Sequence, residues 1–163
     1  MKIIEGTGVK QAIHDAYRRG AIVAGTSAGA AMMSEVMITG DEKNYPEYSA
    51  TFKNIEPDNI VTAPGLRLLT DAVVDQHFIK RSRYNRLISA VIDYPSLMGI
   101  GIDESTAILV DGNGKAEVVG ENQVIVLRNA QKEKKLTGSK MGTTGMLMDV
   151  LLPGDTFQVE RVD

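Results

Sequence analysis

Residues 21–33 have the sequence AIVAGTSAGAAMM, and this stretch decides the fold class. The apolar, partly β-branched run at 21–25 ends in a glycine, and another glycine precedes it. Such a run predicts a short, fully buried strand of a parallel sheet. The small residues at 28–33 predict a buried helix directly after the strand.

The residues before this stretch predict an amphipathic helix over 9–19. Val9, Ile13 and Tyr17 recur at the spacing of one helix face, and Gly20 provides a C-terminal stop. The order helix, strand, turn, helix indicates a layered α/β fold.

Farther along the chain, apolar periodicity and turn residues predict a helix and several strands. The helix is expected over 84–94, and residues 39–59 form a long polar loop. The predicted strands cover residues 72–74, 98–102, 107–110, 116–120, 124–127 and 156–162. The C-terminal third is therefore expected to be mostly β, within a single domain spanning 1–163.

The composition excludes several classes of protein. Hydrophobic residues make up 43% of the 163 residues and charged residues 24%, which is typical of a globular chain with a core. A net charge of −3 argues against a nucleic-acid binder. The absence of cysteine excludes thiolate metal sites and cysteine nucleophiles, and two histidines argue against a histidine metal site. We expect no metal and no cofactor.

Apolar runs and the N-terminal residues bear on localisation. The longest apolar runs are far shorter than a membrane span, so no membrane partner is expected. The first ten residues do not have the pattern of a secretory signal, which predicts a cytoplasmic protein.

Residues 25–29, GTSAG, match the G-x-S-x-G pattern of a nucleophile elbow. In such an elbow, Ser27 would stand exposed on a sharp turn between strand and helix. The N–H of Ala28 would point at a developing oxyanion. The alternative is a tight glycine turn in which the serine caps the helix.

A serine nucleophile needs a base and an orienting acid. Of the two histidines, His14 falls on a charged helix face, whereas His77 follows a predicted strand, where catalytic groups of α/β sheets gather. This favours His77 over its alternative as a core-edge residue. Asp103 and Glu104 end another predicted strand, and the residues alone leave open which of them meets the histidine.

A basic cluster follows His77. Arg81, Arg83 and Arg86 lie within nine residues of it, with Lys80 beside them. Because guanidinium groups bind carboxylates in a bidentate manner, the cluster suggests an anionic substrate. The alternative is a basic helix start whose arginines pair with surface acids.

Three stretches together resemble the cyanophycinases, in the serine peptidase group that also contains the aspartyl dipeptidases. The stretches are residues 24–33, 63–86 and 99–107, and the resemblance extends from about Val9 to the C-terminus. It implies a three-layer flavodoxin-like fold, similar to class I glutamine amidotransferases, and a homodimer. It also implies a serine exopeptidase that cleaves cyanophycin to β-aspartyl-arginine dipeptides through an acyl-enzyme.

The resemblance assigns roles residue by residue. Ser27 would be the nucleophile, His77 the base, Glu104 the acid and Ala28 an oxyanion donor. The residues that fall where the family lines its substrate pocket are Asp75, Gln76, Arg81, Arg83 and Arg86. The arginines favour the cyanophycinase branch over an aspartyl dipeptidase, which is kept as an alternative.

The chain also departs from the family. Relatives carry a long segment before the part that matches Val9, which supplies the first strands of the sheet, a second oxyanion donor and a pocket glutamine. Losing one oxyanion donor typically costs about a hundred- to a thousandfold in rate. The alternative function is therefore an inactive remnant, or one half of a split enzyme whose N-terminal half is a separate chain, acting as a binding or assembly module. Residues 40–59 are also unlike the short connection expected of the family.

Overall fold

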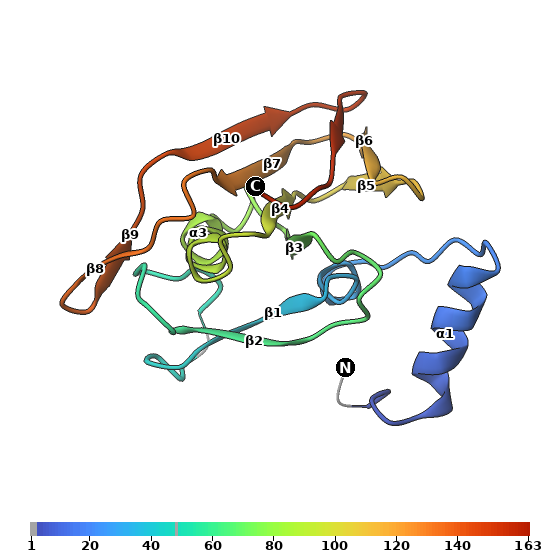
Figure 1. Cartoon of the computed structure of the whole chain (residues 1–163), viewed down its shortest axis with the longest axis horizontal. Helices are drawn as coiled ribbons and strands as arrows, with labels where there is room; N and C mark the ends of the chain where they lie inside the picture. Colours follow the sequence, from blue (N-terminus) through green and yellow to red (C-terminus); the bar gives the residue numbers. More distant parts are fainter. Residues whose placement is uncertain (1–2, 48) are drawn as a thin grey trace.

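The computed structural model describes residues 3–47 and 49–163, and its centre is a four-stranded sheet (Figure 1). In spatial order the strands are β10 (Met146–Leu151), β7 (Val124–Asn129), β4 (Met98–Ile102) and β3 (Ala72–Gln76). Only β3 and β4 run parallel, and the other neighbours are antiparallel. The fold is therefore mixed α/β.

One face of this sheet is covered by α3 (Tyr84–Asp93), which confirms the helix predicted there. Leu87 and Val91 of α3 are fully buried against Val73 of β3 and Leu127 of β7. The ribbon of β1 (Val36–Glu42) and β2 (Ile60–Pro64) closes the same core.

Two glycines of β4 allow this close packing. A Cβ atom on Gly99 would lie 2.6 Å from a methyl group of Val91, and one on Gly101 would lie 2.4 Å from the ring of Phe78. Both distances are far below van der Waals contact. The alternating glycines of the strand therefore explain how α3 and Phe78 reach the sheet.

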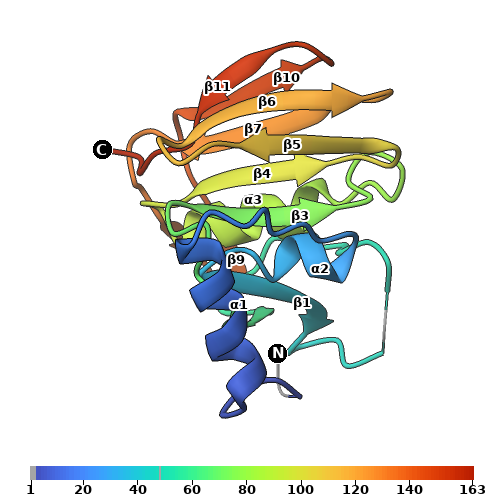
Figure 2. The same cartoon turned by 90° about the vertical axis from the view of Figure 1, so that its right-hand side faces the viewer.

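The opposite face carries a second, three-stranded antiparallel sheet. In spatial order its strands are β11 (Thr156–Gln158), β6 (Lys115–Gly120) and β5 (Thr106–Val110). Ala116 and Val118 pack on Ile100 and Val126 of the central sheet. In Figure 2 the two sheets overlap in the view, and β5 and β6 run along nearly the same line as β4 and β7. The β5–β6 hairpin, with its turn around Asp111, confirms the predicted hairpin.

The C-terminal third is β-rich, as predicted. Besides the strands above, it holds the short hairpin of β8 (Lys135–Thr137) and β9 (Lys140–Gly142). Two predicted boundaries were wrong: β11 ends at Gln158, and the expected loop at 39–59 is shorter because β1 runs to Glu42. Pairing of β1 with β2 orders residues whose polarity had suggested a loop.

The strand predicted at 21–25 is wrong. These residues are extended but belong to no sheet of the described chain, and the Ile22 side chain is 95% exposed. A strand requires a paired neighbour, which periodicity does not supply. The helix after it, α2 (Ala28–Ala31), is a single turn in which only Ala31 is buried, so the buried helix expected over 28–33 was also too long.

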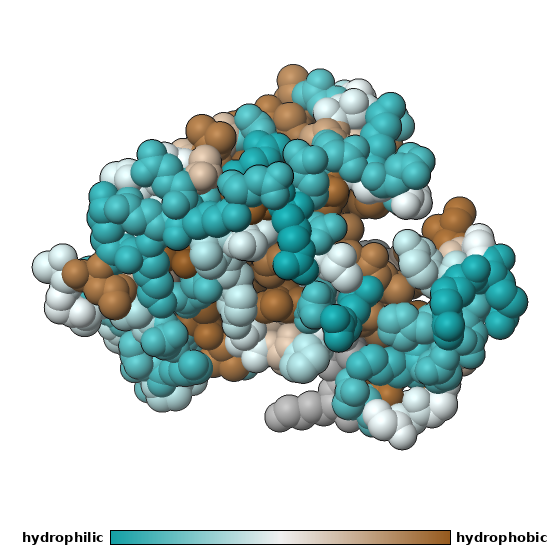
Figure 3. Space-filling view, in the orientation of Figure 1, coloured by the Kyte–Doolittle hydropathy of each residue, from teal (hydrophilic) through white to brown (hydrophobic). Residues whose placement is uncertain are grey.

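The predicted N-terminal helix is α1 (Gly8–Arg18), which stands apart from the sheets (Figure 1). The Thr7 hydroxyl caps it by accepting from the Val9 N–H. None of its residues is buried, and Val9 and Tyr17 remain exposed. Figure 3 shows apolar atoms at the surface between the α1 segment and the rest of the molecule. In the described part of the chain, helices long and apolar enough to cross a membrane are not found.

Candidate active site

Ser27 lies on a strained turn between the extended segment and α2. Its φ of +52° and ψ of −120° are rare for a residue with a side chain. A Cβ atom on Gly25 would lie 2.2 Å from the Gly29 carbonyl oxygen, so this turn requires glycine at 25. The serine side chain makes no capping hydrogen bond to α2. The turn therefore presents the hydroxyl outward instead of using it as a helix cap.

The Ser27 hydroxyl meets the imidazole of His77. Ser27 Oγ is 3.0 Å from His77 Nε2, within hydrogen-bond distance. His77 directly follows β3, and its φ is +50°, another left-handed conformation. The other histidine, His14, lies in α1, and its carbonyl oxygen accepts from Arg18 of the same helix.

Glu104 completes a chain of three side chains. Its Oε1 is 3.0 Å from His77 Nδ1. The Glu104 side chain is 40% exposed and the His77 side chain 26% exposed. The contact follows from the sheet: β3 and β4 are parallel neighbours with Gln76 opposite Ile102, so residues just after each strand meet at one edge.

Asp103 points elsewhere, although it also follows β4. Its Oδ1 accepts from the Lys80 N–H at 3.0 Å, and its own N–H donates to the Gln123 carbonyl. Asp103 thereby supports the turn after His77. The geometry thus separates two acids that the sequence left equivalent.

The N–H of Ala28 lies next to the serine at the start of α2. Gly29 and Ala30 donate their N–H groups to the carbonyls of Thr26 and Ser27. No carbonyl acceptor for the Ala28 N–H is found among the described residues, and Ala28 is exposed. This donor is therefore available to an oxygen held near Ser27 Oγ.

Three residues expected to line the substrate pocket are buried instead. Asp75 is 0% exposed, and Arg83 and Arg86 are each 3% exposed. Arg86 binds the Asp75 carboxylate with two nitrogens, and Arg83 Nη1 lies 3.8 Å from the same carboxylate. This differs from the expectation because the buried ion pair leaves these side chains no surface on which to meet a substrate.

The other two expected residues, Gln76 and Arg81, are not buried. Gln76 Oε1 is 3.5 Å from Ser27 Oγ, at the limit of a hydrogen bond. Arg81 is exposed, and its carbonyl accepts from the Thr51 hydroxyl at 2.9 Å, which ties the loop before β2 to the turn after His77. Lys80, beside it, is also exposed.

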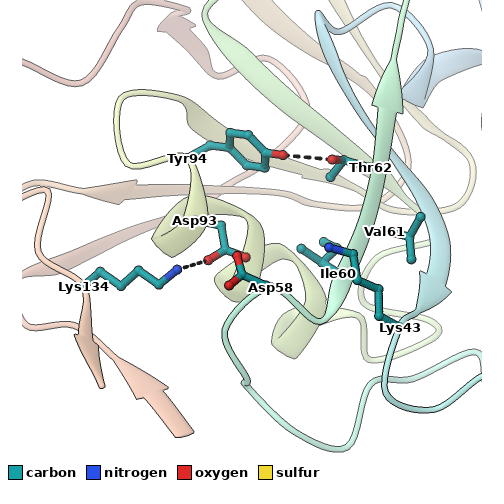
Figure 4. A pocket seen from close by; sticks show the side chains of 8 residues that line it. All are labelled: Lys43, Asp58, Ile60, Val61, Thr62, Asp93, Tyr94 and Lys134. Atoms are coloured by element: carbon teal, nitrogen blue, oxygen red, sulfur yellow. Dashed lines mark hydrogen bonds and ion pairs between the residues drawn. The ribbon is translucent and has the colours of Figure 1, made fainter. Parts of the chain in front are cut away.

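Two cavities found in the described part of the chain are not lined by Ser27, His77 or Glu104. One, of about 320 Å³, is lined by residues of β2, the end of α3 and the loops beside them (Figure 4). In it, the Tyr94 and Thr62 hydroxyls are hydrogen bonded and Lys134 pairs with Asp93. The hydrogen bond from Lys134 to Asp93 is the main reason that the pKa of Lys134 is raised. The other, of about 550 Å³, is lined by residues between Glu42 and Asn54.

Clusters of three or more potential metal ligands are not found in residues 3–47 and 49–163. Sequence reasoning missed the supporting role of Gly101 beside Phe78; the alternation of glycine and isoleucine at 99–102 was the available signal.

Several known proteins are similar to the chain in sequence. The cyanophycinase of Synechococcus elongatus is 37% identical over 115 residues, which are 70% of this chain and 33% of the relative. That of Trichormus variabilis is 36% identical over 126 residues, covering 77% of this chain and 40% of the relative. That of Geminocystis herdmanii is 32% identical over 126 residues, covering 77% and 43%. The chain thus spans less than half the length of these relatives.

The family comparison covers most of the chain and includes all three residues of the site. The model of peptidase family S51 matches residues 1–118, a range that contains Ser27, His77 and Glu104. With that match and the similarity to cyanophycinases, the chain belongs to peptidase family S51.

Proposed function

We propose that the protein is a serine peptidase that hydrolyses cyanophycin to β-aspartyl-arginine dipeptides through an acyl-enzyme. The observation that carries the proposal is the continuous contact from Ser27 through His77 to Glu104, with 3.0 Å at each step. The names of the relatives supply the substrate class.

The reaction follows from the positions of the donors and acceptors. His77 Nε2 accepts the hydroxyl proton as Ser27 Oγ attacks the scissile carbonyl carbon, while Glu104 accepts the Nδ1–H and stabilises the imidazolium. The Ala28 N–H faces the carbonyl oxygen as it becomes an oxyanion. His77 then gives its proton to the leaving amine, and water releases the acyl group by the reverse sequence.

Substrate recognition is assigned to the groups that remain accessible. The exposed guanidinium of Arg81 suits a carboxylate of an aspartyl peptide, because its fork binds carboxylates in a bidentate manner. Gln76, next to Ser27, offers an amide to the substrate backbone. Asp75, Arg83 and Arg86 act behind this surface.

The proposal includes the wider fold. The extended segment at 21–26 would become a strand of a flavodoxin-like sheet if another polypeptide supplied its neighbour. The exposed Ile22 and the position of β3 at the edge of the central sheet, among the described residues, support this arrangement. A second copy in a homodimer or a separate N-terminal half is the partner that we propose, in the cytoplasm and without metal or cofactor.

A specific observation favours a second candidate, a binding or assembly module without turnover. The chain spans only 33–43% of the length of the cyanophycinases that it matches. If the second oxyanion donor implied by the resemblance were lacking, the rate would fall about a hundred- to a thousandfold. A peptidase of aspartyl dipeptidase type is the remaining alternative.

The test uses the purified chain, soluble cyanophycin and mass spectrometry of the products, with Ser27→Ala as the control. Serine-dependent release of β-aspartyl-arginine supports the peptidase. A fluorophosphonate probe, which reacts with activated serines, is applied in parallel. Labelling that persists unchanged in Ser27→Ala would contradict the assignment of the nucleophile. Labelling of Ser27 without turnover would favour the module.

A further inference from the structure

A buried ion pair lies directly behind the candidate site. Asp75 is the fourth residue of β3, and Arg86 lies in the first turn of α3. Two nitrogens of Arg86 contact the two carboxylate oxygens of Asp75, one at 2.6 Å. On the β1 side, a Cβ atom on Gly40 would lie 3.4 Å from Arg86 Nη1, so β1 passes next to the guanidinium. A buried pair of this kind is matched in charge and shape, so removing one partner leaves the other uncompensated.

We propose that Asp75 and Arg86 are positioning residues that hold His77 in register with Ser27. The inference rests on the proposed role of His77 as the base. It assigns to the two buried residues a task other than binding the substrate.

The pair reaches His77 through the backbone of Gln76. Asp75 Oδ1 accepts from the Gln76 N–H at 2.7 Å, and Arg83 Nη1 donates to the Gln76 carbonyl at 2.7 Å. Both peptide groups that flank Gln76 are thus held by the buried cluster. The second of these groups leads directly into His77.

His77 needs this support because its backbone is strained. Its φ of +50° is a conformation that a residue with a side chain adopts only when its surroundings impose it. On the far side, the Phe78 N–H donates to the Ile102 carbonyl, and the Arg81 N–H donates to the His77 carbonyl. The turn is therefore held from both ends, and the ion pair is its anchor on the β3 side.

Nuclear magnetic resonance of the histidine rings tests this role without requiring turnover. The chain has two histidines, and His14 on α1 serves as the internal reference. Because Glu104 faces Nδ1 and the Ser27 hydroxyl faces Nε2, His77 should carry its proton on Nδ1 in the neutral form. Ring ¹⁵N chemical shifts distinguish this tautomer from the Nε2–H form that free histidine prefers.

In Asp75→Asn we expect His77 to move toward the Nε2–H tautomer while His14 is unchanged. We also expect fluorophosphonate labelling of Ser27 to slow by up to about a hundredfold, because misplacement by about 1 Å can cost that much. Arg86→Lys, which keeps the charge but loses the fork, should show the same changes to a smaller extent. It serves as the readout if Asp75→Asn does not fold.

Glu56→Gln is the matched control. Glu56 is also a buried carboxylate with several donors, but its partners are Asn44, Tyr45 and Lys140. This variant should leave the His77 ring unchanged. A folded Asp75→Asn or Arg86→Lys with the wild-type tautomer and labelling rate would overturn the proposal, as would an Nε2–H tautomer in the wild type. Failure to hydrolyse cyanophycin would count against the proposed function alone, because the tautomer is read independently.

Discussion

Replacing Gly101 with alanine should disturb both the core and the candidate site. The added Cβ atom would lie 2.4, 2.5 and 2.6 Å from three ring atoms of Phe78. Carbon atoms pack at about 3.5–4.0 Å, so the ring must retreat by about 1 Å. Phe78 is fully buried and stacks edge-on with Tyr84 at 4.8 Å, which leaves it little room to move.

Overpacking of this kind costs about 1–3 kcal/mol. For a chain of this size, the melting temperature should fall by about 2–12 °C. Because Phe78 follows His77 in the chain, a 1 Å shift of the ring should also slow labelling of Ser27. Thermal unfolding followed by circular dichroism measures the first effect, and reaction with a fluorophosphonate measures the second.

Gly112→Ala is the control, since a Cβ atom there would meet nothing within 4 Å. Adding Phe78→Leu to Gly101→Ala should restore part of the lost stability, because the smaller side chain removes the ring that the new Cβ atom meets. If Gly101→Ala melts at the wild-type temperature, as Gly112→Ala should, the packing argument for β4 is refuted.

Three further predictions concern other parts of the structure. Gly25→Ala should abolish labelling of Ser27, because the added Cβ atom would lie 2.2 Å from a backbone oxygen. Gly29→Ala should not, because there is open space around that position. Equal labelling of the two variants would contradict the proposed geometry of the turn around Ser27. Ser34→Ala should lower the free energy of unfolding, measured in urea, by about 1–3 kcal/mol, because the buried Ser34 hydroxyl accepts from the Val74 N–H of β3. An unchanged urea midpoint would argue against that hydrogen bond. Glu56→Gln should destabilise the protein at pH 7 and progressively less as the pH falls toward 3. Hydrogen bonds, first from Lys140, lower the pKa of Glu56, so the stability that its carboxylate contributes is present above about pH 4.3 and is lost as the pH falls through the folded-state pKa. An equal loss at both pH values would contradict this linkage.

Local patterns predicted the elements whose partners are close in sequence. The helix over 84–94 and the hairpin on either side of Asp111 depend on spacing and turn chemistry within about a dozen residues, and both are present. The strand at 21–25 has the composition of a buried strand, yet it has no paired neighbour among the described residues. The strand β1 was missed because its polar residues are ordered by pairing with β2, which begins eighteen residues later.

The sequence by itself determined the chemistry of the candidate site. A serine between glycines and small residues, a histidine after one strand and two acids after another are visible without coordinates. The pattern of residues nominated Ser27 and His77, and the resemblance then selected Glu104 over Asp103.

Only the tertiary structure decided how these groups are arranged. The parallel pairing of β3 with β4 brings His77 within 3.0 Å of Glu104, while Asp103 turns to the backbone of Lys80. The tertiary structure also buries Arg83 and Arg86, which the sequence could not distinguish from Arg81. The physical reason is that contact and burial depend on which distant segments meet at the sheet edge, and an arginine has the same chemistry in the sequence whether a neighbouring layer covers it or not.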